Sequence, residues 1–213
     1  ILPPPIAKRL KEKEQSNSHE NIADGYPVCS VLFADIVGFT VLSQQLNPSH
    51  LVQILNDIFS RFDSLAERYN LEKIKTIGDA YMVASGIPTA NGNHAQDIAQ
   101  FAVDMRDCMK EFSVENGFDI NIRIGIHSGP AVAGVIGKKK FIYDIWGDTV
   151  NTASRMESHG KPGEIHISNL TKELLGNNYN FEDCGEIAVK GKGKMRTWIL
   201  KGKLNTGDMR ISI

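Results

Sequence analysis

The chain has 213 residues, of which 41% are hydrophobic and 23% charged, so it has enough apolar material for one domain with a buried core. Its formal net charge is −1, which argues against a nucleic-acid binder, since that class carries a clear excess of basic residues. The three cysteines are scattered and form no CxxC pair, so nothing indicates a disulfide framework or a zinc site, and a reducing, cytoplasmic compartment is favoured.

The first 27 residues differ from the rest in composition. Three prolines at 3–5 precede a short charged segment at 6–14, and a polar Ser/Asn stretch follows. With so few apolar residues this segment cannot build a core of its own, and we interpret residues 1–27 as a connector that is partly helical or disordered. No apolar run reaches the length of a membrane span. The chain begins at Ile1 rather than Met, so we expect a longer parent protein.

The apolar run at residues 28–36 predicts a buried strand. Asn47 and Pro48 are typical of a helix start, and apolar residues at three- and four-residue steps continue that helix to Tyr69. Two short runs at 72–77 and 80–84, broken by Gly78 and Asp79, predict a tight hairpin. A second amphipathic helix follows, with these apolar residues on one face: Ile98, Phe101, Ala102, Met105, Met109 and Phe112.

The second half of the chain continues the alternation of strands and helices. We expect strands at 120–126 and 131–136, a helix at 148–158, a strand at 164–167, a short helix at 170–175, and strands near Phe181 and Trp198. Gly160 is expected to cap the helix at 148–158 in a left-handed conformation. The order strand–helix–strand–strand–helix–strand predicts an α+β sandwich of ferredoxin-like type over residues 28–203, with 204–213 as a C-terminal tail.

Two aspartates follow strongly apolar strands and are candidates for a metal site. Asp35 ends the first strand, and Asp79 lies at the hairpin tip after another. If the two strands are neighbours, both carboxylates project from the same end of the sheet, and a few hard oxygen ligands with room for water and phosphate suit magnesium. Taken singly, each also fits a plain role, Asp35 as a helix cap and Asp79 as a turn residue.

The remaining polar signals are modest when taken one at a time. Asn151 and Arg155 lie four apart on one helical face, where they suit a transferring phosphoryl group or simply form a solvated surface pair. The loop at 189–194 alternates lysine with glycine and either reaches over a triphosphate or is a soluble turn. Lys138 to Lys140 read as a solvated turn. Together, two acidic positions, an Asn/Arg pair and a lysine loop match what phosphoryl transfer on a nucleotide requires.

At this point the sequence strongly resembles the class III adenylyl and guanylyl cyclases. The segments that carry the resemblance are FADIVGFT at 33–40, EKIKTIGDAYMVASG at 72–86, RIGIHSGPAVAGVIG at 123–137, YDIWGDTVNTASRMES at 143–158 and VKGKG at 189–193. The resemblance implies a ferredoxin-like domain that acts as a head-to-tail homodimer, with active sites at the interface. It also implies an upstream sensor or membrane region in the parent chain.

The same resemblance assigns roles to individual residues. Asp35 and Asp79 are expected to bind two Mg²⁺ or Mn²⁺ ions per site, with Ile36 beside them. One ion would activate the ribose 3′-hydroxyl and the other would hold the β- and γ-phosphates. Backbone amides between Ile36 and Thr40, including that of Phe39, would assist. The partner chain would contribute Asn151 to orient the ribose and Arg155 to stabilise the transition state. Lys190 would contact the terminal phosphates.

Base selection depends on Lys75 and Asp144, the positions at which the family reads the purine. Adenine offers an acceptor at N1 and a donor at N6, which a lysine and an aspartate match, whereas guanine reverses both. A mismatch leaves buried groups unpaired at about 1–3 kcal/mol each. The sequence therefore predicts ATP as substrate and cyclic AMP as product. The alternatives are a guanylyl cyclase, or a catalytically silent nucleotide-binding regulatory domain; no GG[DE]EF-type hairpin supports a diguanylate cyclase.

Overall fold

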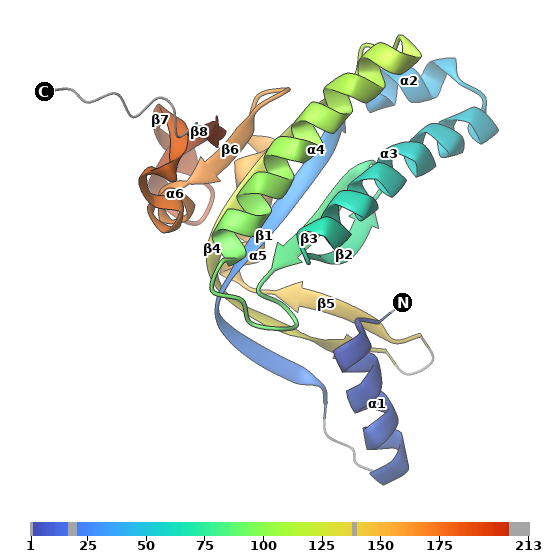
Figure 1. Ribbon diagram of the computed structural model, residues 1–213, viewed down its shortest axis with the longest axis vertical. Helices are drawn as coiled ribbons and strands as arrows, with labels where there is room; N and C mark the ends of the chain where they lie inside the picture. The colour runs from blue at the N-terminus through green and yellow to red at the C-terminus, as the bar shows by residue number, and fades with distance from the viewer. Residues whose placement is uncertain (1, 17–20, 138–139, 205–213) are drawn as a thin grey trace, which may run out of the picture.

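A central β-sheet organises the molecule, and the computed structural model describes it over residues 2–16, 21–137 and 140–204 (Figure 1). The strands are β1 (Ala23–Val37), β2 (Glu72–Ile77), β3 (Ala80–Ser85), β4 (Asn121–Ile136), β5 (Ile142–Trp146), β6 (Ile165–Ser168), β7 (Tyr179–Val189) and β8 (Gly193–Lys203). The helices are α1 (Pro4–Ser16), α2 (Phe39–Gln45), α3 (Pro48–Arg68), α4 (His94–Asn116), α5 (Asp148–Ser158) and α6 (Asn169–Leu175), with a 3₁₀ turn at Gly176–Asn178.

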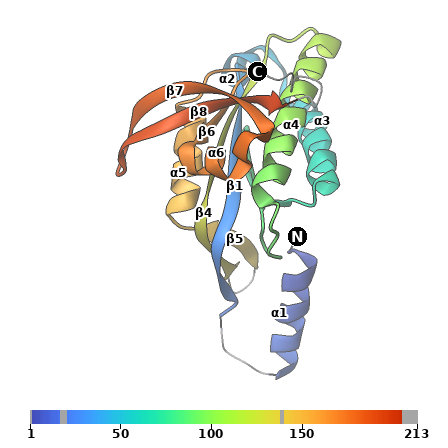
Figure 2. The same ribbon diagram turned by 60° about the vertical axis from the view of Figure 1, so that its left-hand side comes forward.

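The sheet order confirms the predicted ferredoxin-like core. The strands run β2-β3-β1-β4-β6-β8-β7, and β5 pairs with β4. Within this order β1 is antiparallel to both β3 and β4. Helix α3 lies between β1 and β2 in the chain, and α4 connects β3 to β4. The long β7–β8 hairpin curves out from the side of the sheet on which α5 lies (Figure 2).

Helices α3 and α4 cover one face of the sheet and form the larger apolar core with β1, β3 and β4. All six apolar residues predicted for the second amphipathic helix are buried in α4. The proline-led helix α3 begins as expected, because the Asn47 side chain accepts a hydrogen bond from the His50 N–H at 2.9 Å. Among the described helices, none is long and apolar enough to cross a membrane.

The opposite face of the sheet is covered by α5, β5 and α1, which share a second apolar cluster. Here α5 packs closely on β4, since a Cβ placed on Gly125 would lie 1.9 Å from the Glu157 backbone nitrogen. Only a glycine permits this approach of helix to strand.

Several expected boundaries are wrong. Strand β1 begins at Ala23, before the expected residue 28, and the strands expected at 120–126 and 131–136 form one strand, β4. Tyr26 pairs with Ala131 and Cys29 with Gly129, so a bulge lies at this point. Prolines 27 and 130 lie within that irregularity, where a missing ladder N–H is tolerated.

One prediction for a glycine is wrong, two elements were not predicted, and two predicted segments lie outside the described residues. Gly160 has no positive φ and is not a left-handed cap; a Cβ there would lie 3.1 Å from the Glu157 carbonyl oxygen, which is tighter than an ordinary contact. Helix α2 and strand β5 were not predicted at all. Residues 138–139 of the expected lysine turn and 205–213 of the expected tail lie outside the described residues.

Candidate functional site

The structure brings Asp35 and Asp79 together at one end of the sheet. Asp35 lies near the end of β1 and pairs with Ala80 of β3, the residue that follows Asp79 in the β2–β3 turn. Gly78 adopts a φ of 63°, which permits that tight turn. Burial raises the pKa of the Asp35 carboxyl, and the negative charge of Asp79 raises it further. The two carboxylates are therefore close enough to repel one another.

Arg123 is a charged neighbour of this pair that the sequence interpretation missed. It lies in β4 directly opposite Asp35, and its Nη2 donates to Asp35 Oδ2 at 3.2 Å. Its Nε donates to Glu157 Oε1 of α5 at 2.6 Å. The signal in the sequence was an arginine within an apolar strand, but its partner depends on the register between β1 and β4. The guanidinium therefore links the carboxylates to α5.

The chemistry of Asp35 and Asp79 fits a divalent cation. Two repelling carboxylates, one of them half-buried, gain stability from a cation between them. Across the described ranges no group of three or more His, Cys, Asp or Glu side chains could enclose a metal. An ion held here by two carboxylates would retain open positions for water and phosphate oxygens, as Mg²⁺ requires.

The segment after Asp35 leads into α2. Ile36 is buried in β1 at 3% exposure, so only its backbone is available to a ligand. Gly38 has a φ of 90° and precedes α2, in whose first turn Phe39 and Thr40 lie. Phe39 packs against the larger core, and Thr40 is exposed. Since α2 has only seven residues, its dipole contributes little, and any anion contact here depends on individual N–H groups.

Lys75 and Asp144 also meet, although they come from different parts of the chain. Lys75 lies in β2 and Asp144 in β5, and the Lys75 ammonium donates to Asp144 Oδ2. The other oxygen, Asp144 Oδ1, accepts the N–H of Ile145 at 2.9 Å. The Asp144 side chain is only 12% exposed, whereas that of Lys75 is 39% exposed. The pair thus holds a donor and an acceptor side by side, with the lysine half-exposed and the carboxylate largely buried.

Asn151, Arg155 and the lysine loop form a third group on the flank of α5. Asn151 is exposed, and Arg155 is one turn further along the same helix. The β7–β8 turn lies beside them, since a Cβ on Gly191 would lie 4.0 Å from Arg155 Nη2. An ion pair between Lys192 and Asp148 fastens this turn to the start of α5. Lys190 is exposed in the same turn.

The predicted residues therefore fall into separate groups within one chain. Among the described residues, no hydrogen bond or ion pair joins Asn151 or Arg155 to Asp35 or Asp79. The Arg155 side chain makes no ion pair in this part of the chain either, so its charge is available to a ligand.

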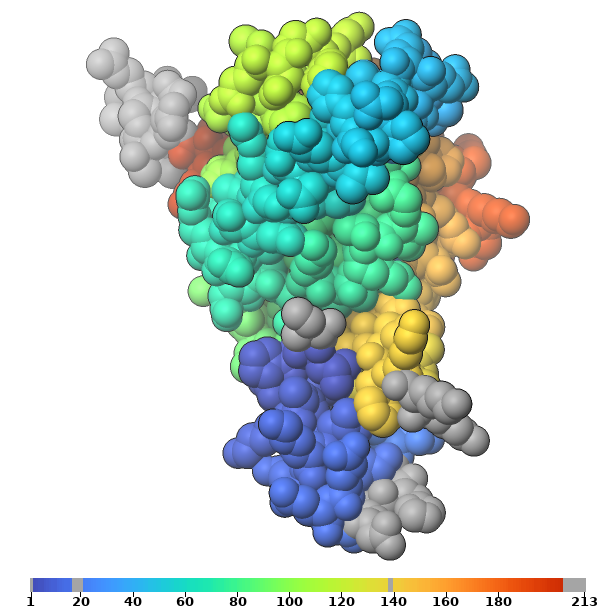
Figure 3. Space-filling view, turned by 90° about the vertical axis from the view of Figure 1, so that its right-hand side faces the viewer, coloured from blue at the N-terminus to red at the C-terminus, as the bar shows by residue number. Residues whose placement is uncertain are grey.

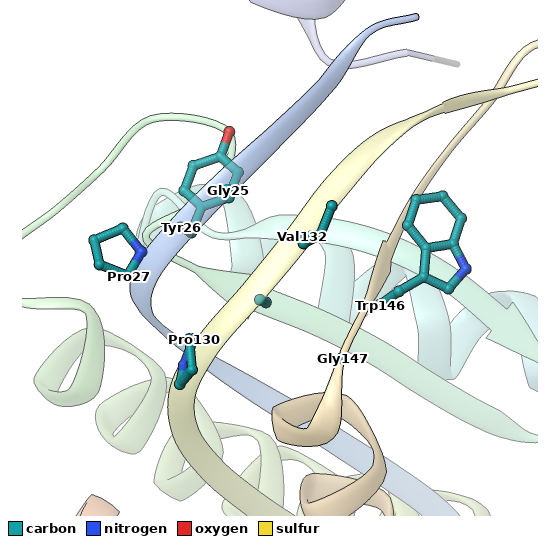
Figure 4. A pocket seen from close by; sticks show the side chains of 8 residues that line it. Gly25, Tyr26, Pro27, Pro130, Val132, Trp146 and Gly147 are labelled. Carbon is teal, nitrogen blue, oxygen red and sulfur yellow. The ribbon is translucent and has the colours of Figure 1, made fainter.

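An open apolar pocket of about 480 Å³ lies between β1, β4 and β5 (Figure 4). Tyr26 and Pro27 line one side, Trp146 the other, and Val132 lies between them. Val132 is 48% and Trp146 40% exposed, which is high for side chains of this kind on a sheet.

Comparison with known proteins gives a consistent result. The model of the "Adenylate and Guanylate cyclase catalytic domain" family matches residues 22–202. An adenylate cyclase of Mycobacterium tuberculosis is 45% identical over 98% of this chain and 46% of its own length. The soluble guanylate cyclase subunit beta-2 of Rattus norvegicus is 43% identical over 99% of this chain and 30% of its own length. The chain thus spans less than half of these curated relatives.

A solved structure agrees in fold. The guanylate cyclase domain of RhGC from Catenaria anguillulae, crystallised with GTP, superposes with a TM-score of 0.82 at 39% identity, and the match covers 85% of this chain and all of that one. Family model, relatives and structure coincide over the same segment, and the chain belongs to the adenylate and guanylate cyclase catalytic-domain family.

Proposed function

We propose that this domain is an adenylyl cyclase, which converts ATP to cyclic AMP and pyrophosphate at sites shared between two copies of the chain. The observation that carries the choice of ATP is the contact between Lys75 and Asp144. Membership of the cyclase family alone leaves the purine open, because relatives of similar identity include both adenylate and guanylate cyclases.

The Lys75–Asp144 pair matches the edge of adenine. A lysine ammonium has three N–H donors, so one can remain on Asp144 while another donates to N1. Asp144 Oδ2 can likewise accept from N6 while it accepts from Lys75, since a carboxylate oxygen has two lone pairs. Guanine presents a donor at N1 and an acceptor at O6, and against this pair both of its groups would be mismatched.

The other residues have roles that follow from their charge and position. In the reaction the ribose 3′-oxygen attacks the α-phosphorus and the bond to the β-phosphate oxygen breaks. When bound at Asp35 and Asp79, Mg²⁺ or Mn²⁺ supplies polarisation of the 3′-hydroxyl and neutralisation of the phosphates. Asn151 orients the ribose. Arg155, which makes no ion pair among the described residues, stabilises negative charge that develops on the transferring phosphoryl group.

The phosphates have their own cationic neighbours. Lys190 is exposed in the turn that lies beside Arg155, and we assign it to the terminal phosphates. Arg123 contacts Asp35. A cation at Asp35 would compete for that carboxylate and leave the Arg123 guanidinium available to a phosphate oxygen.

A homodimer explains why these groups lie apart in one chain. The carboxylate pair of one copy would face Asn151 and Arg155 of the second, so each dimer would have two complete sites. The apolar surface around Val132 and Trp146 supports this, because a second copy of the chain would cover it. We further propose that an upstream sensor or membrane region in the parent protein alters the dimer arrangement and thereby the rate.

A guanylyl cyclase is the second candidate, and the similarity to the GTP-bound domain favours it. A catalytically silent nucleotide-binding domain is the third. Its weakness is that Asp35, Asp79, Asn151 and Arg155 are all present, although a silent domain needs none of them.

The decisive assay is product identity. Purified chain at high concentration receives Mg²⁺ or Mn²⁺ with ATP or GTP separately, and the products are separated. We expect cyclic AMP from ATP, lost in Asp79→Ala and retained in Asp57→Ala, an exposed aspartate of α3 away from the site. Cyclic GMP instead would overturn the base assignment, and no product from a demonstrably dimeric sample would overturn the enzyme itself.

A second experiment tests the base assignment directly. The double variant Lys75→Glu with Asp144→Cys replaces a donor with an acceptor at one position and removes the carboxylate at the other. We expect its preference to shift from ATP towards GTP. Unchanged selectivity for ATP in a folded double variant would show that the base is recognised elsewhere.

A further inference from the structure

Helix α1 is held to the domain by few side chains. Within it only Ile6 is fully buried, at 1% exposure, while Leu2 and Leu10 pack partly on the same cluster. Arg9 makes a two-pronged ion pair with Asp24 of β1, with Nη1–Oδ2 at 2.5 Å and Nη2–Oδ1 at 3.1 Å. A helix of 13 residues is marginal in water by itself, so its docking depends on these contacts.

The surface that receives α1 includes the strand that carries Asp144. Figure 3 shows α1 below the β2–β3 hairpin and beside the segment that contains β5. Ile6 belongs to the same apolar cluster as Tyr143 and Ile145, the two residues that flank Asp144. In the part of the chain that the structure describes, β5 pairs only with β4. Packing from α1 therefore contributes to the position of an edge strand.

A polar layer connects the same elements. The Tyr143 hydroxyl is buried close to the Tyr26 hydroxyl. Burial raises its pKa, and the neighbouring Tyr26 and the charges of Glu72 and Asp24 raise it further. Two acidic residues therefore lie near Tyr143. Asp24 is on β1 and pairs with Arg9, and Glu72 is on β2, the strand that also carries Lys75.

We propose that α1 is a positioning element for base recognition, which acts through β5 when Ile6 and the Arg9–Asp24 pair hold it in place. A docked α1 keeps Asp144 against Lys75. A displaced α1 lets β5 shift, so the purine is selected less well. The inference rests on the proposed function, because that function assigns Lys75 and Asp144 to the base. Contacts to the purine are made alike in the bound substrate and in the transition state, so the effect of Arg9 and Ile6 falls on KM and on the ATP:GTP ratio rather than on kcat.

Charge reversal in the full chain tests this. Arg9→Asp and Asp24→Arg each place like charges together, and the double variant restores the pair with its signs exchanged. We expect each single variant to raise KM for ATP and lower the ATP:GTP ratio by about fivefold or more, and the double variant to recover. Lys8→Asp is the matched control, since Lys8 is 79% exposed on the same helix and, within the described ranges, pairs only with Glu12.

A second readout does not depend on activity. The chain has two tryptophans, and Trp146 lies in β5, so Trp198→Phe leaves a single reporter on that strand. At one fixed protein concentration, the single charge variants should change Trp146 emission and the double variant should reverse the change. Emission that changes without any change in the ATP:GTP ratio would overturn the proposal, as would no change in either. If the parent chain makes no cyclic nucleotide, the proposed function fails, while the emission still reports whether α1 positions β5.

Discussion

Gly125 offers a direct test of how closely the site depends on the packing of α5. It lies in β4 beneath the helix that carries Asn151 and Arg155. A Cβ at this position would lie 1.9 Å from the Glu157 nitrogen and 2.4 Å from its Cα, both backbone atoms that no rotamer change can move. To reach the 3.4 Å of an ordinary contact, α5 must move by about 1.5 Å.

Gly125→Ala should therefore affect stability and activity together. Overpacking of this kind costs about 1–3 kcal/mol of folding free energy. Displacement of catalytic groups by about 1 Å costs about 100-fold in rate. Urea unfolding measures the first quantity, and kcat for cyclic AMP formation measures the second.

Gly92→Ala is the matched control, because a Cβ there meets nothing within 4 Å and Gly92 has no positive φ. We expect its free energy of unfolding to lie within about 0.5 kcal/mol of that of the parent chain, and its activity to be unchanged. If Gly125→Ala behaved like Gly92→Ala, the close approach of α5 to β4 would not control the position of its catalytic residues.

Two further outcomes are expected. Burial lowers the pKa of His127, whose Nδ1 lies 2.7 Å from Ser168 Oγ, to about 4. Between pH 6.5 and 4 the unfolded chain then binds more protons than the folded one. His127 therefore contributes about 3 kcal/mol to the free energy of unfolding above pH 6.5, and this contribution is lost as the pH falls towards 4. Across this range the free energy of unfolding should fall less steeply with pH for His127→Asn than for the parent chain. A residual slope is expected from His94 and His166, whose pKa values burial also lowers. An unchanged slope would contradict the lowered pKa of His127. Separately, chelation by EDTA should abolish product formation and added Mg²⁺ should restore it. The thermal midpoint should change little, since Asp35 lies on a paired strand and Asp79 in the turn of a paired hairpin. Activity that persists in EDTA would rule out the metal site.

The sequence predicted those elements whose periodicity is carried by their own residues. Helix α4 has apolar residues on one face at every turn. The hairpin could be predicted because Gly78 readily adopts the positive φ that its turn requires. Helix α5 was predicted with its observed bounds. In each case local preference and tertiary packing favour the same structure.

Elements that depend on a distant partner were missed. Residues 23–27 include Asp, Gly and Pro, which are rare in strands, yet they extend β1 because β4 lies beside them. Strand β5 is short and its sequence has no alternation of apolar and polar residues, so it is recognisable only from its pairing with β4.

The candidate site shows the same limit. Asp35 and Asp79 could be predicted as neighbours, since each follows an apolar strand. Arg123 could not be assigned to them, because its place opposite Asp35 depends on a register that the sequence does not display. The ion pair between Arg9 of α1 and Asp24 of β1 could not be predicted either, because it too joins residues that are not neighbours in sequence.

The claim that most of this account depends on is that two chains build each site. Asp79→Ala and Arg155→Ala are each prepared, shown to dimerise, and found inactive with ATP and Mg²⁺. Mixed in equal amounts, they should form heterodimers in about half of the sample, each with one intact site, so about one quarter of the parental cyclic AMP production should return. Recovery to that level would support a shared site, whereas a mixture as inactive as its components, despite proven subunit exchange, would place the carboxylates and Arg155 in the same chain's site and contradict the account.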